Sequence, residues 1–97
     1  MSIIQFSHAN GFPSKTYSVL FEQLKEHKIS TINILGENTN SAEINWYDLR
    51  DEILESAGQH GEAVIGIGHS FGGVLTLLAA AKNPELFHSI ILLDPPL

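Results

Sequence analysis

One short segment of this chain has the residue types and spacing of a nucleophilic site. Residues 66–73 contain the pattern Gly-x-Ser-x-Gly, with Ser70 at its centre. The pattern is typical of a serine on a sharp turn between strand and helix, where side chains at Gly68 and Gly72 would collide with neighbouring main chain. Such a turn exposes the hydroxyl and aims the Phe71 N–H at an oxyanion beside it. We therefore predict Ser70 as a nucleophile and Phe71 as half of an oxyanion hole.

The strand and the helix that this turn requires are predicted independently by the hydrophobic periodicity. Apolar runs rich in β-branched residues alternate with stretches of helical spacing, an order typical of a parallel sheet with right-handed crossover helices. The expected strands are Ser2–Ser7, Ile29–Leu35, Ala63–Ile67 and Ser89–Leu93. The expected helices run from Tyr17 to near Lys28, from Trp46 to Ala57, and from Ser70 to Lys82, where Asn83 and Pro84 stop the last one. The fold class is α/β, with a four-stranded parallel sheet and helices on both faces.

Composition limits the classes of protein that this chain can represent. Its 97 residues, 43% of them hydrophobic, predict a single domain over residues 1–97. The absence of cysteine excludes a disulfide framework, a thiolate zinc site and a cysteine nucleophile. A net charge of -6 without a basic stripe argues against nucleic-acid binding. The amino terminus lacks a positively charged signal region and the apolar run Val74–Ala81 is too short to span a membrane, so we expect a cytoplasmic protein.

The chain resembles the amino-terminal half of an α/β-hydrolase-fold serine hydrolase. The resemblance rests on Gly-His-Ser-Phe-Gly-Gly at 68–73, on His-Ala-Asn-Gly-Phe-Pro at 8–13, and on the segments 83–87 and 90–96 near the carboxyl end. It implies that the second strand lies outside the first and that the third and fourth continue on its other side. It also implies a partial fold, without the family's last strands and lid.

The resemblance further implies a reaction and the residues that perform it. The family's chemistry is hydrolysis of a carboxylic ester or thioester through an acyl-enzyme, here at Ser70, on a small-molecule acyl substrate and without a metal or organic cofactor. In the family the loop after the first strand supplies the second oxyanion N–H, here at Asn10, with Gly11 or Phe12 as alternatives. A serine at position 70 disfavours the dehalogenase and epoxide hydrolase reactions of this fold, which use an aspartate.

The general base is the missing part of this site. The family's catalytic histidine follows further strands, so we expect the 97-residue chain alone to be inactive. Of the five histidines present, His8 lies at the correct sheet edge but is better explained as bracing its loop, and His69 is structural in the family. His27, His60 and His88 are expected to be solvated or capping residues. Asp94, after the fourth strand, is a candidate for the acid that orients the histidine, with a turn-forming Asp-Pro as its alternative.

Two other classes of function remain open on the sequence. Gly66, Gly68 and Gly72 loosely fit a turn that cradles a dinucleotide, although Phe71 occupies the third glycine position of the tight motif. A non-catalytic fragment or interaction module is the other alternative, which would self-associate or bind a complementing fragment through the exposed fourth strand.

Some conspicuous side chains carry no functional prediction. We expect Trp46 and Tyr47 to be core and cap residues. The acidic residues 48, 51, 52 and 55 form a solvated helix face rather than a metal site.

Overall fold

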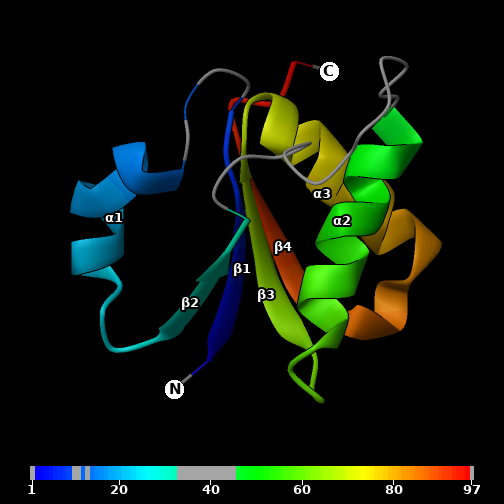
Figure 1. Ribbon diagram of the computed structural model, residues 1–97, viewed down its shortest axis with the longest axis horizontal. Helices are drawn as coiled ribbons and strands as arrows, with labels where there is room; N and C mark the ends of the chain where they lie inside the picture. Colours follow the sequence, from blue (N-terminus) through cyan, green and yellow to red (C-terminus); the bar gives the residue numbers. More distant parts are fainter. Residues whose placement is uncertain (1, 10–11, 13, 33–45, 97) are drawn as a thin grey trace.

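The computed structural model describes residues 2–9, 12, 14–32 and 46–96, and within them four parallel strands form one sheet (Figure 1). The strands are β1 (Ile3–Ser7), β2 (Lys28–Thr31), β3 (Val64–His69) and β4 (Phe87–Leu93). Their order across the sheet is β2-β1-β3-β4, and every neighbouring pair is parallel. This is the strand order that the resemblance implied, so the predicted α/β architecture is confirmed.

Helices cover both faces of the sheet, as the periodicity predicted (Figure 1). One face carries α1 (Ser18–Gln23), which continues the 3-10 helix η1 (Ser14–Tyr17). The other face carries α2 (Trp46–Gly58) and α3 (Phe71–Lys82), and a further 3-10 turn, η2 (Pro84–Leu86), leads into β4. Among the described residues, no helix is long and apolar enough to cross a membrane.

The core beneath α1 is built by alternate residues of the central strands. Ile4 and Phe6 of β1 and Ile67 of β3 are all less than a tenth exposed and pack against the helical side chains. The Phe6 ring meets the Tyr17 ring edge-on at 4.6 Å and the Phe21 ring at 5.1 Å between centroids. The helical spacing of the apolar residues from 17 to 24 therefore serves one face of the sheet, as expected from a 3.6-residue period.

The core on the opposite face joins α2 to α3. Leu49 and Ile53 of α2 pack with Leu75 and Ala79 of α3, and the last three are fully buried. Strand β1 presents Gln5 to this side, where Ser56 of α2 donates a 3.1 Å hydrogen bond to its side-chain carbonyl. This packing joins the two helices to each other and holds α2 against β1 at the centre of the sheet.

Several element boundaries differ from the sequence prediction. The first helix ends at Gln23 rather than near Lys28, because the chain must turn back early to place Lys28 beside Ile3 in the sheet. The Lys28 N–H donates to the Ser2 carbonyl at 3.1 Å, which locks that turn. The second strand is described from 28 to 31, and the predicted positions 33–35 lie outside the described residues.

The two strands on the other side of β1 are longer than predicted. β3 extends to His69 and β4 begins at Phe87, because the two strands pair along their whole length, from Val64 with Phe87 to His69 with Leu93. β4 lies at the edge of the sheet, on the side away from β2. Its Ile91 and Leu93 side chains are 48% and 38% exposed. Edge strands with exposed apolar residues are prone to pair with other chains.

Trp46 and Tyr47 were expected to be core and cap residues, and the core part of this expectation is wrong. Their side chains are 56% and 62% exposed, since the first turn of α2 projects beyond the buried cluster that begins at Leu49. In the third helix, whose residues 74–81 are nearly all apolar, Leu77 nevertheless faces outward and is 37% exposed.

The contrast between two leucines of α3 tests this packing. We expect Leu75→Ala to lower the free energy of unfolding by about 2–5 kcal/mol, because it removes a fully buried side chain and leaves a cavity. Leu77→Ala, in the same helix but on its exposed side, is expected to cost about 1 kcal/mol or less. Urea denaturation followed by circular dichroism measures both. Equal losses would contradict the assignment of the buried face.

Candidate active site

The turn that carries Ser70 has the strained backbone predicted from its sequence. Ser70 joins β3 to α3 with φ 53° and ψ −117°, a left-handed conformation that costs a non-glycine residue about 1–3 kcal/mol. Its N–H donates to the Leu93 carbonyl of β4 at 2.8 Å, and its own carbonyl accepts from the Gly73 N–H at 2.9 Å. Because both main-chain groups are held, the strained residue is fixed at the carboxyl edge of the sheet.

The two glycines of the motif permit a very close approach of main chains. A β-carbon at Gly68 would lie 2.6 Å from the Cα of Gly73 and would collide with the Gly72 carbonyl oxygen. A β-carbon at Gly72 would collide with the carbonyl oxygens of Ser7 and His8. The start of α3 therefore lies directly against the end of β1, which brings His8, the first residue after β1, next to the serine turn.

Phe71 is the first residue of α3, where main-chain N–H groups lack a partner within the helix. No described residue accepts a hydrogen bond from the Phe71 N–H. The N-terminal end of the helix also carries a partial positive charge. This N–H is thus placed, one residue after Ser70, where an anionic oxygen could accept its hydrogen bond.

The loop after β1 holds the second part of the predicted oxyanion hole. Asn10 and Gly11 lie outside the described residues. The Phe12 N–H donates to the Ala9 carbonyl at 3.0 Å, so it is not free to serve an oxyanion in this conformation. Of the three donors considered from the sequence, Phe12 is the one that the geometry disfavours.

Tyr17, predicted from the sequence only as the start of the first helix, connects the two halves of this site. The Tyr17 hydroxyl accepts a 2.9 Å hydrogen bond from the Ala9 N–H, at the start of the loop after β1. The same hydroxyl lies 2.8 Å from Nδ1 of His69, the residue before Ser70, and the two rings meet edge-on. The role was not predicted because Tyr17 fits the apolar spacing of a helix that packs on the sheet. The signal that pointed to it is the hydroxyl itself, since a buried tyrosine hydroxyl needs a hydrogen-bond partner.

The histidines at the carboxyl edge of the sheet have structural partners. His8 is 4% exposed, and its Nδ1 lies 2.7 Å from the Ala9 carbonyl, in keeping with a residue that braces the loop. His69 contacts Tyr17, as described above. In the part of the chain that the structure describes, no hydrogen bond joins a histidine ring to the Ser70 hydroxyl.

The remaining histidines lie at the amino end of the strands, away from Ser70. His27 accepts a 3.2 Å hydrogen bond from the Ser2 N–H, beside the start of β1. His60 follows α2 and precedes β3, and His88 lies at the start of β4. Their expected exclusion from the site agrees with these positions.

Asp94 follows β4 at the same edge as Ser70. It is exposed and has a φ of 48°, a left-handed conformation that aspartate tolerates better than most residues. The preceding residue, Leu93, accepts the Ser70 N–H. Asp94 therefore directly follows a residue that is hydrogen-bonded to Ser70. Its left-handed backbone also fits the alternative explanation, a turn-forming Asp-Pro.

The acidic face of α2 does not form a metal centre in the described part of the chain, where no group of three or more metal-ligating side chains occurs. Burial slightly opposes ionisation of Asp51, but hydrogen bonds and charges from Arg50 and Lys82 outweigh it and lower the pKa of this carboxyl. Asp51 lies 3.0 Å from Arg50 and 3.2 Å from Lys82, so it links α2 to the end of α3.

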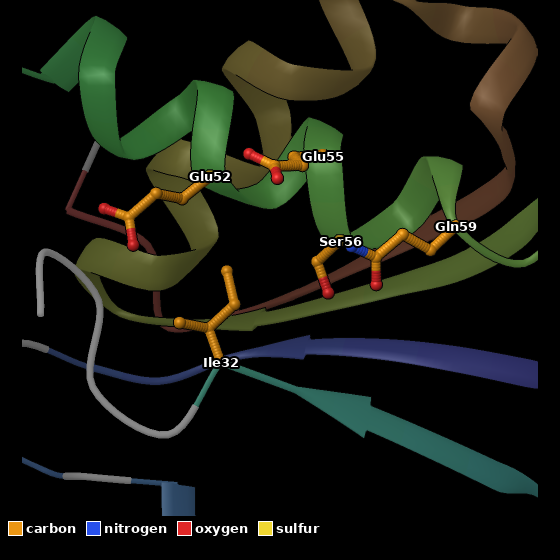
Figure 2. Close-up of a pocket in the computed structure, with 5 residues that line it drawn as sticks. All are labelled: Ile32, Glu52, Glu55, Ser56 and Gln59. Carbon is orange, nitrogen blue, oxygen red and sulfur yellow. The ribbon is translucent and has the colours of Figure 1, made fainter. Parts of the chain in front are cut away.

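A hollow of about 370 Å³ lies along α2, apart from the serine turn (Figure 2). The residues that line it are Ile32, Glu52, Glu55, Ser56 and Gln59. None of them belongs to the serine turn or to the loop after β1. The hollow is therefore not the site that the Gly-x-Ser-x-Gly motif predicts.

Two features together define a class of fold: the strand order β2-β1-β3-β4 and a strained serine between β3 and α3. The chain belongs to the alpha/beta hydrolase family, whose family model matches residues 6–97. Among solved structures, it is similar to an N-formylmaleamic acid deformylase from Pseudomonas putida, with a TM-score of 0.84 at 24% identity over 98% of this chain. It is also similar to a monoacylglycerol lipase from Paleococcus ferrophilus, with a TM-score of 0.82 at 19% identity over 96% of this chain.

Sequence relatives include an acyl-CoA thioesterase and a monoglyceride lipase homolog. A type I acyl-CoA thioesterase from Penicillium brevicompactum is 30% identical over 92% of this chain. A monoglyceride lipase homolog from Monkeypox virus is 28% identical over 97% of it. The chain spans 25% and 38% of the length of these relatives, and 39% and 38% of the two solved chains named above. The fold described here is accordingly a part of the fold of those proteins.

The Tyr17 hydroxyl provides a direct test of the connection between loop and serine turn. We expect Tyr17→Phe to lower the free energy of unfolding by about 1–3 kcal/mol, because the Ala9 N–H then loses its partner. Tyr47→Phe removes an exposed hydroxyl and is expected to change stability by about 0.5 kcal/mol or less. Chemical denaturation of the two variants gives both values. A loss for Tyr47→Phe as large as for Tyr17→Phe would argue against the bridging role.

Proposed function

We propose that this chain carries the nucleophile of a serine hydrolase that cleaves a carboxylic ester or thioester through an acyl-enzyme at Ser70. The observation that carries the proposal is the backbone of Ser70, whose φ of 53° is stabilised by hydrogen bonds on both sides. A strained conformation held in place by its surroundings is typical of functional residues. Membership of the hydrolase family and the thioesterase and lipase relatives support the same reaction class.

The chemistry follows from the parts of the site. The Ser70 oxygen attacks the acyl carbonyl carbon while a histidine base accepts the hydroxyl proton. The tetrahedral oxyanion accepts hydrogen bonds from the Phe71 N–H and, in this proposal, from the Asn10 N–H. The protonated histidine then donates its proton to the alcohol or thiol group as the bond to that group breaks. The acyl group remains on the Ser70 oxygen as an ester. Water, activated by the same base, then attacks that ester and releases the carboxylic acid with free Ser70.

The base itself is the part for which the described residues offer no candidate. His8 and His69 contact Ala9 and Tyr17, and the other histidines lie at the opposite end of the strands. We therefore propose that the 97-residue chain by itself turns over very slowly, and that a histidine from outside these residues completes the site.

The remaining parts of the proposal concern the acid and the domain. Asp94 is the candidate to orient that histidine, and residues 1–97 are one partial domain. No metal or organic cofactor enters this reaction, and the cytoplasmic location stays a prediction from the sequence.

A non-catalytic interaction module is the second candidate, favoured by one observation. Ile91 and Leu93 expose apolar surface on β4 at the edge of the sheet. A second copy of this chain, or a complementing fragment, could add a strand there. This alternative does not need a reactive serine, so reactivity of Ser70 separates the two functions.

Imidazole can replace the missing base in a test of the proposed function. We expect an alkyl fluorophosphonate to label the wild-type chain at Ser70, faster with imidazole present, and to leave Ser70→Ala unlabelled. Ser89→Ala, at an exposed serine of β4, is the matched control and should be labelled like the wild type. Mass spectrometry of the peptide that contains residue 70 identifies the site.

Hydrolysis of p-nitrophenyl acetate tests the incompleteness of the site. Without imidazole the wild-type chain should be no faster than Ser70→Ala, and with imidazole it should exceed that variant. Rapid Ser70-dependent turnover without imidazole would refute the absence of a base. If Ser70 stays unlabelled under both conditions, the nucleophile assignment fails, and retention of radiolabelled NAD by the same chain would favour the nucleotide-binding alternative.

A further inference from the structure

An exposed aromatic side chain lies beside the serine turn without serving the core. Trp46 is the first residue of α2 and is 56% exposed. Its ring meets the Phe71 ring edge-on, with 5.4 Å between centroids and 69° between planes. Phe71 directly follows Ser70, so a continuous apolar surface begins one residue away from the proposed nucleophile.

The topology places this surface at the functional edge of the sheet. α2 runs from Trp46 toward the amino end of β3, and β3 then returns to Ser70, so both residues lie at the carboxyl edge (Figure 1). Parallel α/β sheets bind their ligands at this edge. The position of Trp46 therefore brings it to the site where a substrate would meet Ser70.

The ring pair is anchored on one side and open on the other. Phe71 is half-buried and packs against the cluster formed by α2 and α3. Trp46 lies outside that cluster and keeps more than half of its surface in solvent. Exposed apolar area costs about 25 cal/mol per Å², so an aromatic side chain here gains free energy when an apolar ligand covers it.

We propose that Trp46 and Phe71 form an apolar wall that receives the acyl chain of the substrate and selects longer aliphatic acyl groups over acetyl. This inference rests on the proposed function, because it assumes that the acyl carbonyl is bound beside Ser70. The carbonyl carbon lies at the serine and the oxyanion at the Phe71 N–H, so the chain attached to that carbon extends along the neighbouring ring surface. Each methylene that this wall covers adds to the binding of the longer chain.

The next aromatic residue of α2 lacks these properties and supplies a matched control. Tyr47 is 62% exposed, similar to Trp46, but the Arg50 guanidinium lies 4.8 Å over the centre of its ring. A charged group over the ring makes it a poor surface for an alkyl chain. Tyr47 is therefore expected to contribute little to acyl-chain binding.

The intrinsic fluorescence of the chain reports on this wall directly, because Trp46 is its single tryptophan. We would titrate the 97-residue chain carrying Ser70→Ala with acetate, hexanoate and decanoate, each below its micelle concentration. Decanoate should produce a saturable blue shift of the emission and bind at least tenfold more tightly than hexanoate, and acetate should produce no shift. No saturable shift with decanoate, or equal affinity for hexanoate and decanoate, would overturn the proposal.

Further substitutions locate the ligand. In the Ser70→Ala background, Phe71→Ala should weaken decanoate binding at least fivefold, and Phe71→Leu, which keeps an apolar anchor in the core, should weaken it less. Tyr47→Ala should change the affinity less than twofold, and so should Ile91→Ser, which removes exposed apolar surface on β4. Far-UV circular dichroism checks the folding of each variant. A larger loss in Tyr47→Ala or Ile91→Ser than in the Phe71 variants would place the ligand elsewhere and overturn the proposal.

This design separates the wall from the nucleophile. The Ser70→Ala chain cannot form an acyl-enzyme, so its binding of decanoate does not depend on reactivity. If Ser70 is never labelled but decanoate binds at Phe71, the proposed function fails and the apolar site remains. If Ser70 is labelled but chain length has no effect on binding, the wall proposal fails and the proposed function remains.

Discussion

The whole site depends on the close approach of three main chains at two positions that lack a β-carbon. Gly72 contacts the carbonyls of Ser7 and His8 at the end of β1, and Gly68 contacts Gly72 and Gly73 across the serine turn. A methyl group at either position would push α3 away from β1 and β3. The strain at Ser70, the orientation of the Phe71 N–H and the nearness of the loop after β1 all follow from this contact, since each depends on where α3 begins.

Hydrogen bonds then hold the parts that this contact brings together. The Leu93 carbonyl of β4 holds Ser70 from one side, and Tyr17 links Ala9 to His69 from the other. These bonds come from three elements that are far apart in the sequence. Preorganised donors stabilise a developing oxyanion best when they do not have to move during the reaction. The hydrophobic contacts of Phe6 with Tyr17 and Phe21 contribute to that rigidity, because they fix the helix that carries the Tyr17 hydroxyl.

Much of the fold could be predicted because each element has a simple local period. The spacing of Leu49, Ile53 and Ala57 in α2 reflects which side of that helix faces the core, and the run of buried residues in β1 reflects a central strand that is covered on both faces. Trp46 shows where this reasoning fails. It continues the same helical stripe as Leu49, yet it is exposed, because the buried cluster of described residues begins at Leu49 and Trp46 meets only its edge, at Phe71. The early end of α1 also depends on a tertiary contact. The helix ends because Lys28 must pair with Ile3 in the sheet, and no local helix-breaking residue marks that end in the sequence.

The sequence by itself determined the α/β order, the Gly-x-Ser-x-Gly turn and the candidate nucleophile Ser70, because periodicity and glycine spacing are local properties of the chain. Only the tertiary structure decided that Tyr17 joins the two halves of the site and that Trp46 faces solvent beside Phe71. These facts depend on contacts between residues distant in the sequence. Such contacts are fixed by how the sheet and helices pack, which no local pattern specifies.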